Sequence, residues 1–108
     1  MSGFAKEQVA IAQGVICDGD EIIIRLIGDK VVRFPITVSA MLQVAEKQER
    51  INCELMPGGM GIEWPELDEQ LSIQGLLDGE SSRQSLESAR RALARLRQRN
   101  REQVAFAG

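Results

Sequence analysis

The first third of the chain alternates between apolar segments and short polar turns, as antiparallel strands do. Residues 9–17 are mostly apolar, residues 21–27 are rich in β-branched side chains, and residues 30–36 alternate between apolar and polar positions. Asp-Gly after the first segment supplies the positive φ that hairpin turns need, and residues 28–29 predict a two-residue turn of type II′. Pro35 should end the third strand or place it at an edge.

The next segment changes from this alternation to the spacing of a helix. Between residues 37 and 50, Met41 and Ala45 mark an apolar side, while polar and charged residues occupy the other side. This spacing predicts one short amphipathic helix in the middle of the chain. Thr37 or Ser39 is its expected N-cap, because a hydroxyl there can accept a hydrogen bond from the first turn.

Glycine and proline then separate three further extended segments. Residues 51–56 and 60–64 are predicted to pair as strands, joined by the Pro-Gly-Gly turn between them. Pro65 should end the second of these strands, since proline cannot continue a sheet ladder. Residues 71–74 are expected to form a short strand or extended segment.

The last quarter of the chain predicts one long helix. Residues 80–103 are dominated by Ala, Leu, Arg and Gln, which favour helices, and Ser81 followed by Gln84 fits a capping box. We therefore expect an α+β domain with a mainly antiparallel sheet of about five or six strands, one short central helix and a long C-terminal helix. Residues 1–79 would form the body, and residues 80–108 an arginine-rich helix and tail of the same domain.

Composition indicates a packed core that contains few aromatic side chains. Apolar residues make up 44% of the chain and aromatic residues 4%, so the core must consist mainly of Ile, Val, Leu and Met. Trp64 should be buried within it. The other side chains expected in the same core are Ile22, Ile24, Val32, Phe34, Ile62 and Leu71.

The sequence favours the cytoplasm over a membrane or an oxidising compartment. Lys6 and Glu7 stand where a signal peptide would need an apolar stretch, and no run approaches the ~18 apolar residues of a membrane span. Cys17 and Cys53 lie in strand-like segments, where cysteine usually behaves as a small buried hydrophobe. A disulfide between them stays open at this point.

Several chemistries lack the residues that they need. The chain has no histidine, which excludes Ser-His-Asp and Cys-His nucleophiles, and two distant cysteines cannot complete a zinc site. The glycine-rich residues 57–61 precede a predicted strand and contain no lysine, so a turn is favoured over a phosphate-binding loop. We expect no catalytic residue, cofactor or metal site.

One acidic cluster is a weaker candidate for chemistry. It consists of Glu63, Glu66, Asp68 and Glu69, which could provide an acid-base pair or ligands for a hard metal ion. Such clusters are more often solvated surface, and Asp68 and Glu69 are suited to capping a turn. An enzyme is therefore the least favoured of the functions that we consider.

The most specific pattern lies in residues 61–79, GIEWPELDEQLSIQGLLDG. It resembles the C-terminal half of the DUF2442 family, where a glycine-rich turn leads to a strand ending in Trp-Pro, followed by Leu-Asp-Glu, a short strand and Gly-Leu-Leu. The matching positions are Gly58, Gly59, Gly61, Ile62, Trp64, Pro65, Leu67, Asp68, Glu69, Leu71, Ser72, Gly75, Leu76 and Leu77. The upstream hairpin and central helix also fit, so the resemblance covers roughly residues 9–95.

The resemblance implies a small domain without an assigned function. Some members of the family look like partners of small toxin-like proteins of the DUF4160 type, and others carry a helix-turn-helix after the domain. This chain has too few residues after Gly79 for a complete helix-turn-helix. We therefore expect a non-enzymatic interaction or regulatory module, with an antitoxin-like partnership as its specific form and a nucleic-acid-binding regulator as the alternative.

Charge is distributed unevenly along the chain. Residues 1–79 hold 6 Lys and Arg against 13 Asp and Glu, a net charge of −7, while residues 80–108 hold 7 Arg against 3 Glu, a net charge of +4. Six arginines of the tail are candidate contacts to an acidic partner: Arg90, Arg91, Arg95, Arg97, Arg99 and Arg101. That partner would be a nucleic acid or the acidic body of a second copy of the chain.

A row of mostly apolar residues follows the same predicted helix at intervals of three and four. This leucine row consists of Leu86, Ala89, Leu93, Leu96 and Asn100. It fits equally well a helix packed on its own sheet or a seam between two copies, in which an Asn fixes the register. We expect a protein partner and a homodimer, and we do not favour nucleic acid because the whole chain has a net charge of −3.

Overall fold

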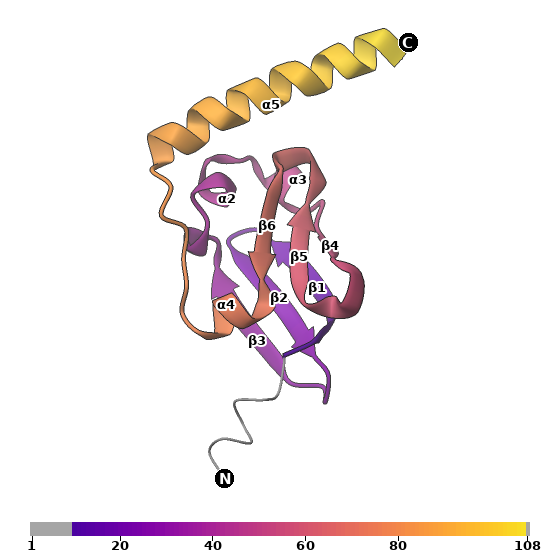
Figure 1. Ribbon diagram of the computed structural model, residues 1–108, viewed down its shortest axis with the longest axis vertical. Coiled ribbons are helices and arrows are strands. Elements are labelled where there is room, and N and C mark those ends of the chain that lie inside the picture. Colours follow the sequence, from indigo (N-terminus) through magenta and orange to yellow (C-terminus); the bar gives the residue numbers. More distant parts are fainter. Residues whose placement is uncertain (1–9, 108) are drawn as a thin grey trace.

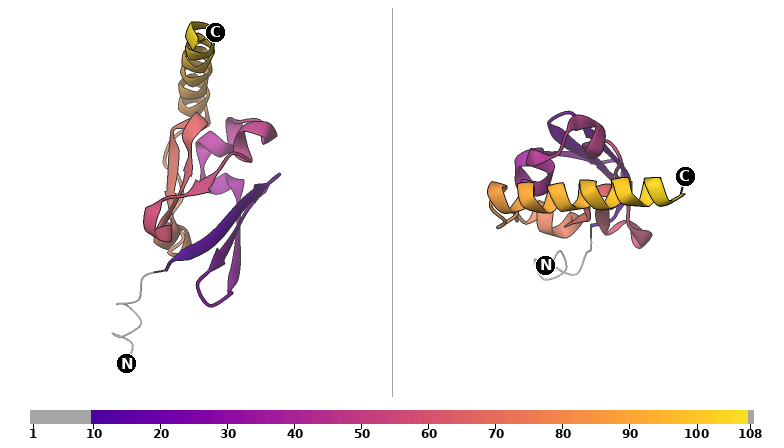
Figure 2. Two further views of the ribbon diagram at one scale, coloured as in Figure 1. Left: turned by 90° about the vertical axis from the view of Figure 1, so that its right-hand side faces the viewer. Right: turned by 90° about the horizontal axis from the view of Figure 1, so that it is seen from above.

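Six strands form two antiparallel sheets of three strands each in the computed structural model, which describes residues 10–107. The first sheet has the order β1 (Ala12–Asp18), β2 (Glu21–Leu26) and β3 (Val31–Pro35). The second has the order β4 (Glu54–Leu55), β5 (Gly61–Trp64) and β6 (Glu69–Ser72). The α+β class and the number of strands confirm the prediction, but the strands divide between two sheets (Figure 2). Buried residues of both sheets form one hydrophobic core.

Alternation along the strands produces this core. In the first sheet, Cys17, Ile22 and Phe34 lie directly opposite one another, so their side chains share the inner face. On neighbouring positions the side chains point outward, and Ile16 is 61% exposed. The central strand β2 is therefore buried on one face only.

Trp64 is fully buried where the two sheets meet, as predicted. Ile22, Ile24 and Ile62 are fully buried beside it, and the other predicted members, Val32, Phe34 and Leu71, are partly buried against the same cluster. The indole Nε1–H of Trp64 donates to the backbone carbonyl of Arg50 at 2.8 Å. The polar edge of this large side chain is thus satisfied inside the core.

The central segment differs from the single predicted helix. It consists of a 3₁₀ turn η1 (Ile36–Val38) and two short helices, α2 (Ala40–Val44) and α3 (Lys47–Arg50). Ser39 caps α2, because its Oγ accepts from the N–H of Leu42 at 3.1 Å. The chain is extended at Ala45 and Glu46, and a capping box between Glu46 and Glu49 begins a new helix there.

The hairpin between β2 and β3 also differs from its prediction. Gly28 and Asp29 both have positive φ, 93° and 64°, whereas a type II′ turn requires this only at its first central residue. Strand β2 ends at Leu26 and β3 begins at Val31, so the connection between them is longer than two residues.

The second half contains two further 3₁₀ turns, η2 (Pro57–Gly59) and η3 (Pro65–Leu67), and two helices, α4 (Ile73–Leu77) and α5 (Leu86–Ala107). The predicted extended segment at residues 71–74 is divided between the end of β6 and the start of α4. The long helix begins at Leu86 rather than Glu80, because the N–H of Ser82 donates to the carbonyl of Val38 and holds the preceding residues against the body. Ser85, not Ser81, accepts from the first turn of α5.

Helix α5 lies across one end of the body, and its C-terminal end extends past it (Figure 1). A helix of 22 residues is about 33 Å long at 1.5 Å per residue. The principal extents of the molecule are 56, 29 and 22 Å, so the helix spans more than the width of the body.

Candidate interaction surface on the C-terminal helix

The leucine row of α5 packs against the body of the same chain over most of its length. Ala89, Leu93 and Leu96 are buried, and α5 contacts α2 and η3. Leu86, at the start of the helix, is 40% exposed, and Asn100 is half-buried. Packing within one chain therefore accounts for the burial of Leu93 and Leu96, and the expected homodimer stays a prediction.

One ion pair fixes the middle of α5 to the body. The Nε and Nη2 atoms of Arg97 donate to the two carboxylate oxygens of Glu49 on α3, at 3.0 and 2.7 Å. The hydrogen bonds from Arg97 hold the pKa of the Glu49 carboxyl below its usual value, although partial burial opposes this shift. Hydrogen bonding to Glu49 likewise raises the pKa of Arg97.

Substituting Glu49 with glutamine should weaken this attachment. We expect Glu49→Gln to lower the free energy of unfolding at pH 7 by about 1 kcal/mol, because the pair is two-pronged yet only partly buried. Since folding lowers the pKa of Glu49, its contribution is complete at neutral pH and is lost as the pH falls through the pKa of the folded state.

Urea unfolding of both proteins at pH 7 and at pH 3 measures this effect. The difference between Glu49→Gln and the native chain should shrink at pH 3. Glu87→Gln is a matched control, because Glu87 pairs with Arg91 on the exposed face of α5 and should contribute only about 0.3–0.5 kcal/mol. Equal losses for the two variants would contradict the special role of Arg97.

The six arginines divide into paired and unpaired members. Arg97 is bound to Glu49, Arg91 is paired with Glu87 at 2.8 Å, and Arg101 donates to Gln98. Within the part of the chain that the structure describes, four arginines of α5 have no ion pair: Arg90, Arg95, Arg99 and Arg101. All four are exposed, so they form the part of the predicted set that is free to bind a partner.

Two of these arginines overlook a cleft between α5 and the body. The cleft has a volume of about 450 Å³, and its apolar lining includes Met41, Leu67 and Leu96. Arg95 and Arg99 line it together with Asp68 and Glu69. The acidic side chains reduce the positive potential at this place, although no ion pair closes across the cleft in residues 10–103.

The acidic cluster is not assembled into a single site. Glu63 accepts from Gln70 on the outer face of the second sheet, and Glu66 accepts from Asn52. Asp68 ends η3 in the left-handed conformation, with φ of 51°. No group of three His, Cys, Asp or Glu side chains that could hold a metal ion occurs in residues 10–103.

Glu69, the fourth member, turns inward instead. Its Oε2 accepts from the hydroxyl of the fully buried Ser39 at 2.5 Å. Burial raises the pKa of Glu69, the Ser39 hydrogen bond opposes this shift, and the nearby Asp68 carboxylate adds to it. Ser39 thus joins the cap of α2 to the start of β6.

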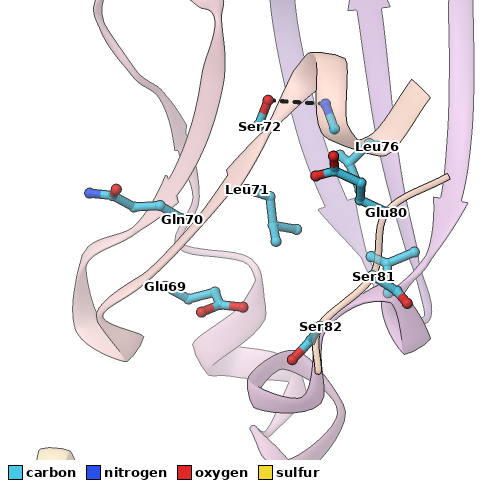
Figure 3. Close-up of a pocket in the computed structure, with 10 residues that line it drawn as sticks. Glu69, Gln70, Leu71, Ser72, Leu76, Glu80, Ser81 and Ser82 are labelled. Carbon is cyan, nitrogen blue, oxygen red and sulfur yellow. Dashed lines mark hydrogen bonds between the residues drawn. The ribbon is translucent and has the colours of Figure 1, made fainter. Parts of the chain in front are cut away.

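A small pocket of about 250 Å³ lies beside this pair, between β6 and the extended residues 80–82 (Figure 3). Leu71 and Leu76 give it an apolar lining, and Glu69 and Glu80 are its ionisable groups. The hydroxyl of Ser72 is engaged as the acceptor of the Gly75 N–H at 3.0 Å. The pocket is a feature of the segment that carries the family resemblance.

The cysteines are free thiols and neighbours in the core. Burial raises the pKa of Cys17 to about 11, with a smaller contribution from Cys53, and burial also raises the pKa of Cys53. Both groups are therefore protonated at neutral pH. In residues 10–107, no helix combines the length and the apolar character that crossing a membrane requires.

The sequence predicted the surface of α5 but not the long-range hydrogen bonds of Arg97 and Glu69. The partners Glu49 and Arg97 are 48 positions apart, and Ser39 and Glu69 are 30 positions apart. Neither pair has a local spacing that would have indicated it. The spacing of the leucine row could be read from the sequence, but the elements that pack against it, α2 and η3, could not.

The family model concerns the body rather than α5. The model of the DUF2442 family, described as a protein of unknown function, matches residues 12–82. No curated protein has significant similarity to the chain. A crystallised protein of unknown function from Rhodospirillum rubrum ATCC 11170 is similar, with a TM-score of 0.65 and 25% identity over 69% of this chain and 93% of that one.

The family match ends at Ser82, and α5 begins at Leu86, so the helix lies outside it. The matched segment comprises both sheets, the central helices and α4. On this match, the chain belongs to the DUF2442 family of proteins of unknown function.

Proposed function

We propose that the protein is a non-enzymatic interaction module in which the DUF2442 body carries α5 as its protein-binding element. The observation that supports this proposal is the state of α5 itself. Its buried row and Arg97 attach it to the body, while Arg90, Arg95, Arg99 and Arg101 stay exposed without an ion pair in residues 10–103. An attached helix with unpaired arginines is preorganised for an acidic partner.

The specific partner that we propose is a small toxin-like protein, so the chain would act as its antitoxin. This part of the proposal comes from the family resemblance alone. Co-expression with the product of the adjacent gene, where that gene encodes such a protein, should give a complex that copurifies and should relieve growth inhibition.

The arginine surface makes the test specific. Arg95→Glu/Arg99→Glu should weaken the complex at least tenfold in titration calorimetry, because two charge-assisted contacts would become repulsive. Arg83→Glu is the control, since Arg83 is exposed in the linker before α5. A complex of unchanged affinity in the double variant would move the binding surface away from α5.

A nucleic-acid-binding regulator is the second candidate, and the spacing of the arginines favours it. Arg91, Arg95 and Arg99 recur every four residues along one side of α5, where they could contact successive phosphates. Asp68 and Glu69 beside Arg95 and Arg99 argue against it. Fluorescence anisotropy with a 30-base-pair duplex at two salt concentrations tests this candidate, since binding to phosphates must weaken steeply with added salt.

A further inference from the structure

The outer face of the first sheet carries apolar side chains where polar ones are the rule. The second sheet packs on the opposite face (Figure 2). An antiparallel sheet with one face in water normally presents polar residues on that face. Here Ile16 on β1 and Val31 on β3 are 61% and 51% exposed, and Ile23 on β2 between them is half-buried. We call the outward side chains of these three strands the outer face.

The strand register arranges the outer face in three rows that cross the sheet. One row contains acidic side chains, the middle row is apolar on two of its strands, and the third row is basic. In the order β1, β2 and β3, the rows are Asp18, Glu21 and Pro35, then Ile16, Ile23 and Arg33, then Gly14, Arg25 and Val31. Acidic, apolar and basic positions therefore follow one another along β2.

The two charged rows are incompletely balanced within one chain. Asp18 lies directly opposite Glu21, where like charges repel. Arg33 donates to Oε1 of Glu21 at 3.1 Å, and Asp18 has no ion pair in residues 10–103. In the basic row, Arg25 reaches only the highly exposed Asp29, at 3.8 Å. The acidic row can thus accept a further cation, and Arg25 a further anion.

A two-fold axis along the middle row makes this face complementary to itself. Such an axis places a second copy on the face with its strands reversed, so Ile16 and Ile23 meet the same residues of the other copy. Glu21 comes opposite Arg25, because each lies two residues from Ile23. The guanidinium of Arg25 lies beside Gly14, 3.7 Å from the place of a Cβ, and would therefore come over Asp18 of the other copy.

Other placements of a second copy are less favourable. An axis along the strands would bring Glu21 onto Glu21 and Arg25 onto Arg25, so that both charged rows repel. With the axis along the middle row, Arg33 is the like-charged residue nearest to it. Each Arg33 reaches back to the Glu21 of its own chain, and the two Glu21 side chains lie on opposite sides of the axis.

We propose that the outer face of the first sheet binds the same face of a second copy, with Glu21 of each chain opposite Arg25 of the other. A two-fold contact of this kind forms a closed dimer. The side chains of both faces would fill the space of about 10 Å between two aligned sheets. Because the face is only three strands wide, at about 4.8 Å per strand, the interface is small and the dimer should dissociate on dilution.

Sedimentation velocity of the full chain tests this inference. The native chain should be a dimer at about 200 µM and a monomer after dilution. Glu21→Arg and Arg25→Glu should each move the midpoint of dissociation at least tenfold towards higher concentration, because each reversal creates two symmetry-related repulsions. An equimolar mixture of the two variants should associate again, since the reversed charge at position 21 of one chain then faces the reversed charge at position 25 of the other.

Matched controls separate this contact from a general effect of net charge or hydrophobicity. Glu54→Arg on β4 and Arg83→Glu before α5 change the net charge by the same amounts at exposed positions outside the face, so the midpoint should stay unchanged. Ile23→Glu, on the proposed axis, should abolish the dimer. Ile51→Glu, at a 54% exposed position after α3, should not. Circular dichroism checks the fold of every variant.

Methyl NMR provides a test on the native chain without any substitution. As the protein is diluted, the methyl resonances of Ile16 and Ile23 should shift, because these side chains leave the contact, whereas those of Ile51 should stay in place. Shifts that spare Ile16 and Ile23 would place self-association elsewhere and reject the proposed face.

Two results of sedimentation would also overturn the inference: a monomeric native chain at about 200 µM, or natively folded Glu21→Arg and Arg25→Glu variants that fail to associate when mixed. The test of α5 is independent of this outcome. Arg95→Glu/Arg99→Glu should leave the dimer intact, because α5 packs on α2 and η3 rather than on the outer face. The proposed function and this inference can therefore fail separately.

Discussion

Replacing Trp64 with alanine should lower the free energy of unfolding by about 3–5 kcal/mol, the range for large-to-small changes in a close-packed core. Trp64 is fully buried where both sheets and the central helices meet. The substitution leaves a cavity among Ile22, Ile24 and Ile62, and it removes the hydrogen-bond donor of the Arg50 carbonyl. Urea unfolding followed by circular dichroism measures the loss.

Two companion variants divide this effect into its causes. Trp64→Phe keeps most of the apolar volume but removes the indole N–H. Apart from the effect of the smaller ring, the lost hydrogen bond should lower the free energy of unfolding by about 1 kcal/mol. Met60→Ala, at an exposed position just before β5, should cost less than about 0.5 kcal/mol. Similar stabilities for Trp64→Ala and Met60→Ala would contradict the burial of the indole.

The strand assignments were sufficient to predict part of the core. Ile22, Ile24, Ile62 and Trp64 occupy alternate positions of β2 and β5, and all four are fully buried. The reason is physical, since side chains at alternate positions of a strand face the same side. Alternation does not determine which sheet a strand joins, and the division into two sheets was therefore not predicted.

The errors fall where tertiary contacts replaced local preference. Residues 37–50 have a helical spacing, yet the chain is extended at Ala45. The guanidinium of Arg50 donates to the carbonyl of Ala45 there, and it also donates to the carbonyl of Gly19 in the turn between β1 and β2. The start of α5 was misplaced for a similar reason, because the bond from Ser82 to Val38 joins residues distant in sequence. Neither bond has a local signal.

The candidate surface shows the same division. The row of Ala89, Leu93 and Leu96 and the six arginines could be read from helical spacing. Whether each of these residues packs on the body, forms an ion pair or stays exposed depends on α2, η3 and Glu49. These approach α5 only in the folded chain.

Gly59→Ala should be far more destabilising than the same change at its neighbour Gly58. Both residues have positive φ, 70° and 84°, which costs an alanine about 1–2 kcal/mol. A Cβ on Gly59 would also lie 2.4 Å from the carbonyl oxygen of Ala12, whereas nothing lies within 4 Å of one on Gly58. Because η2 approaches the start of β1 this closely, Gly59→Ala should cost about 1–3 kcal/mol more than Gly58→Ala in urea unfolding. Equal midpoints for the two variants would show that Ala12 moves aside without cost.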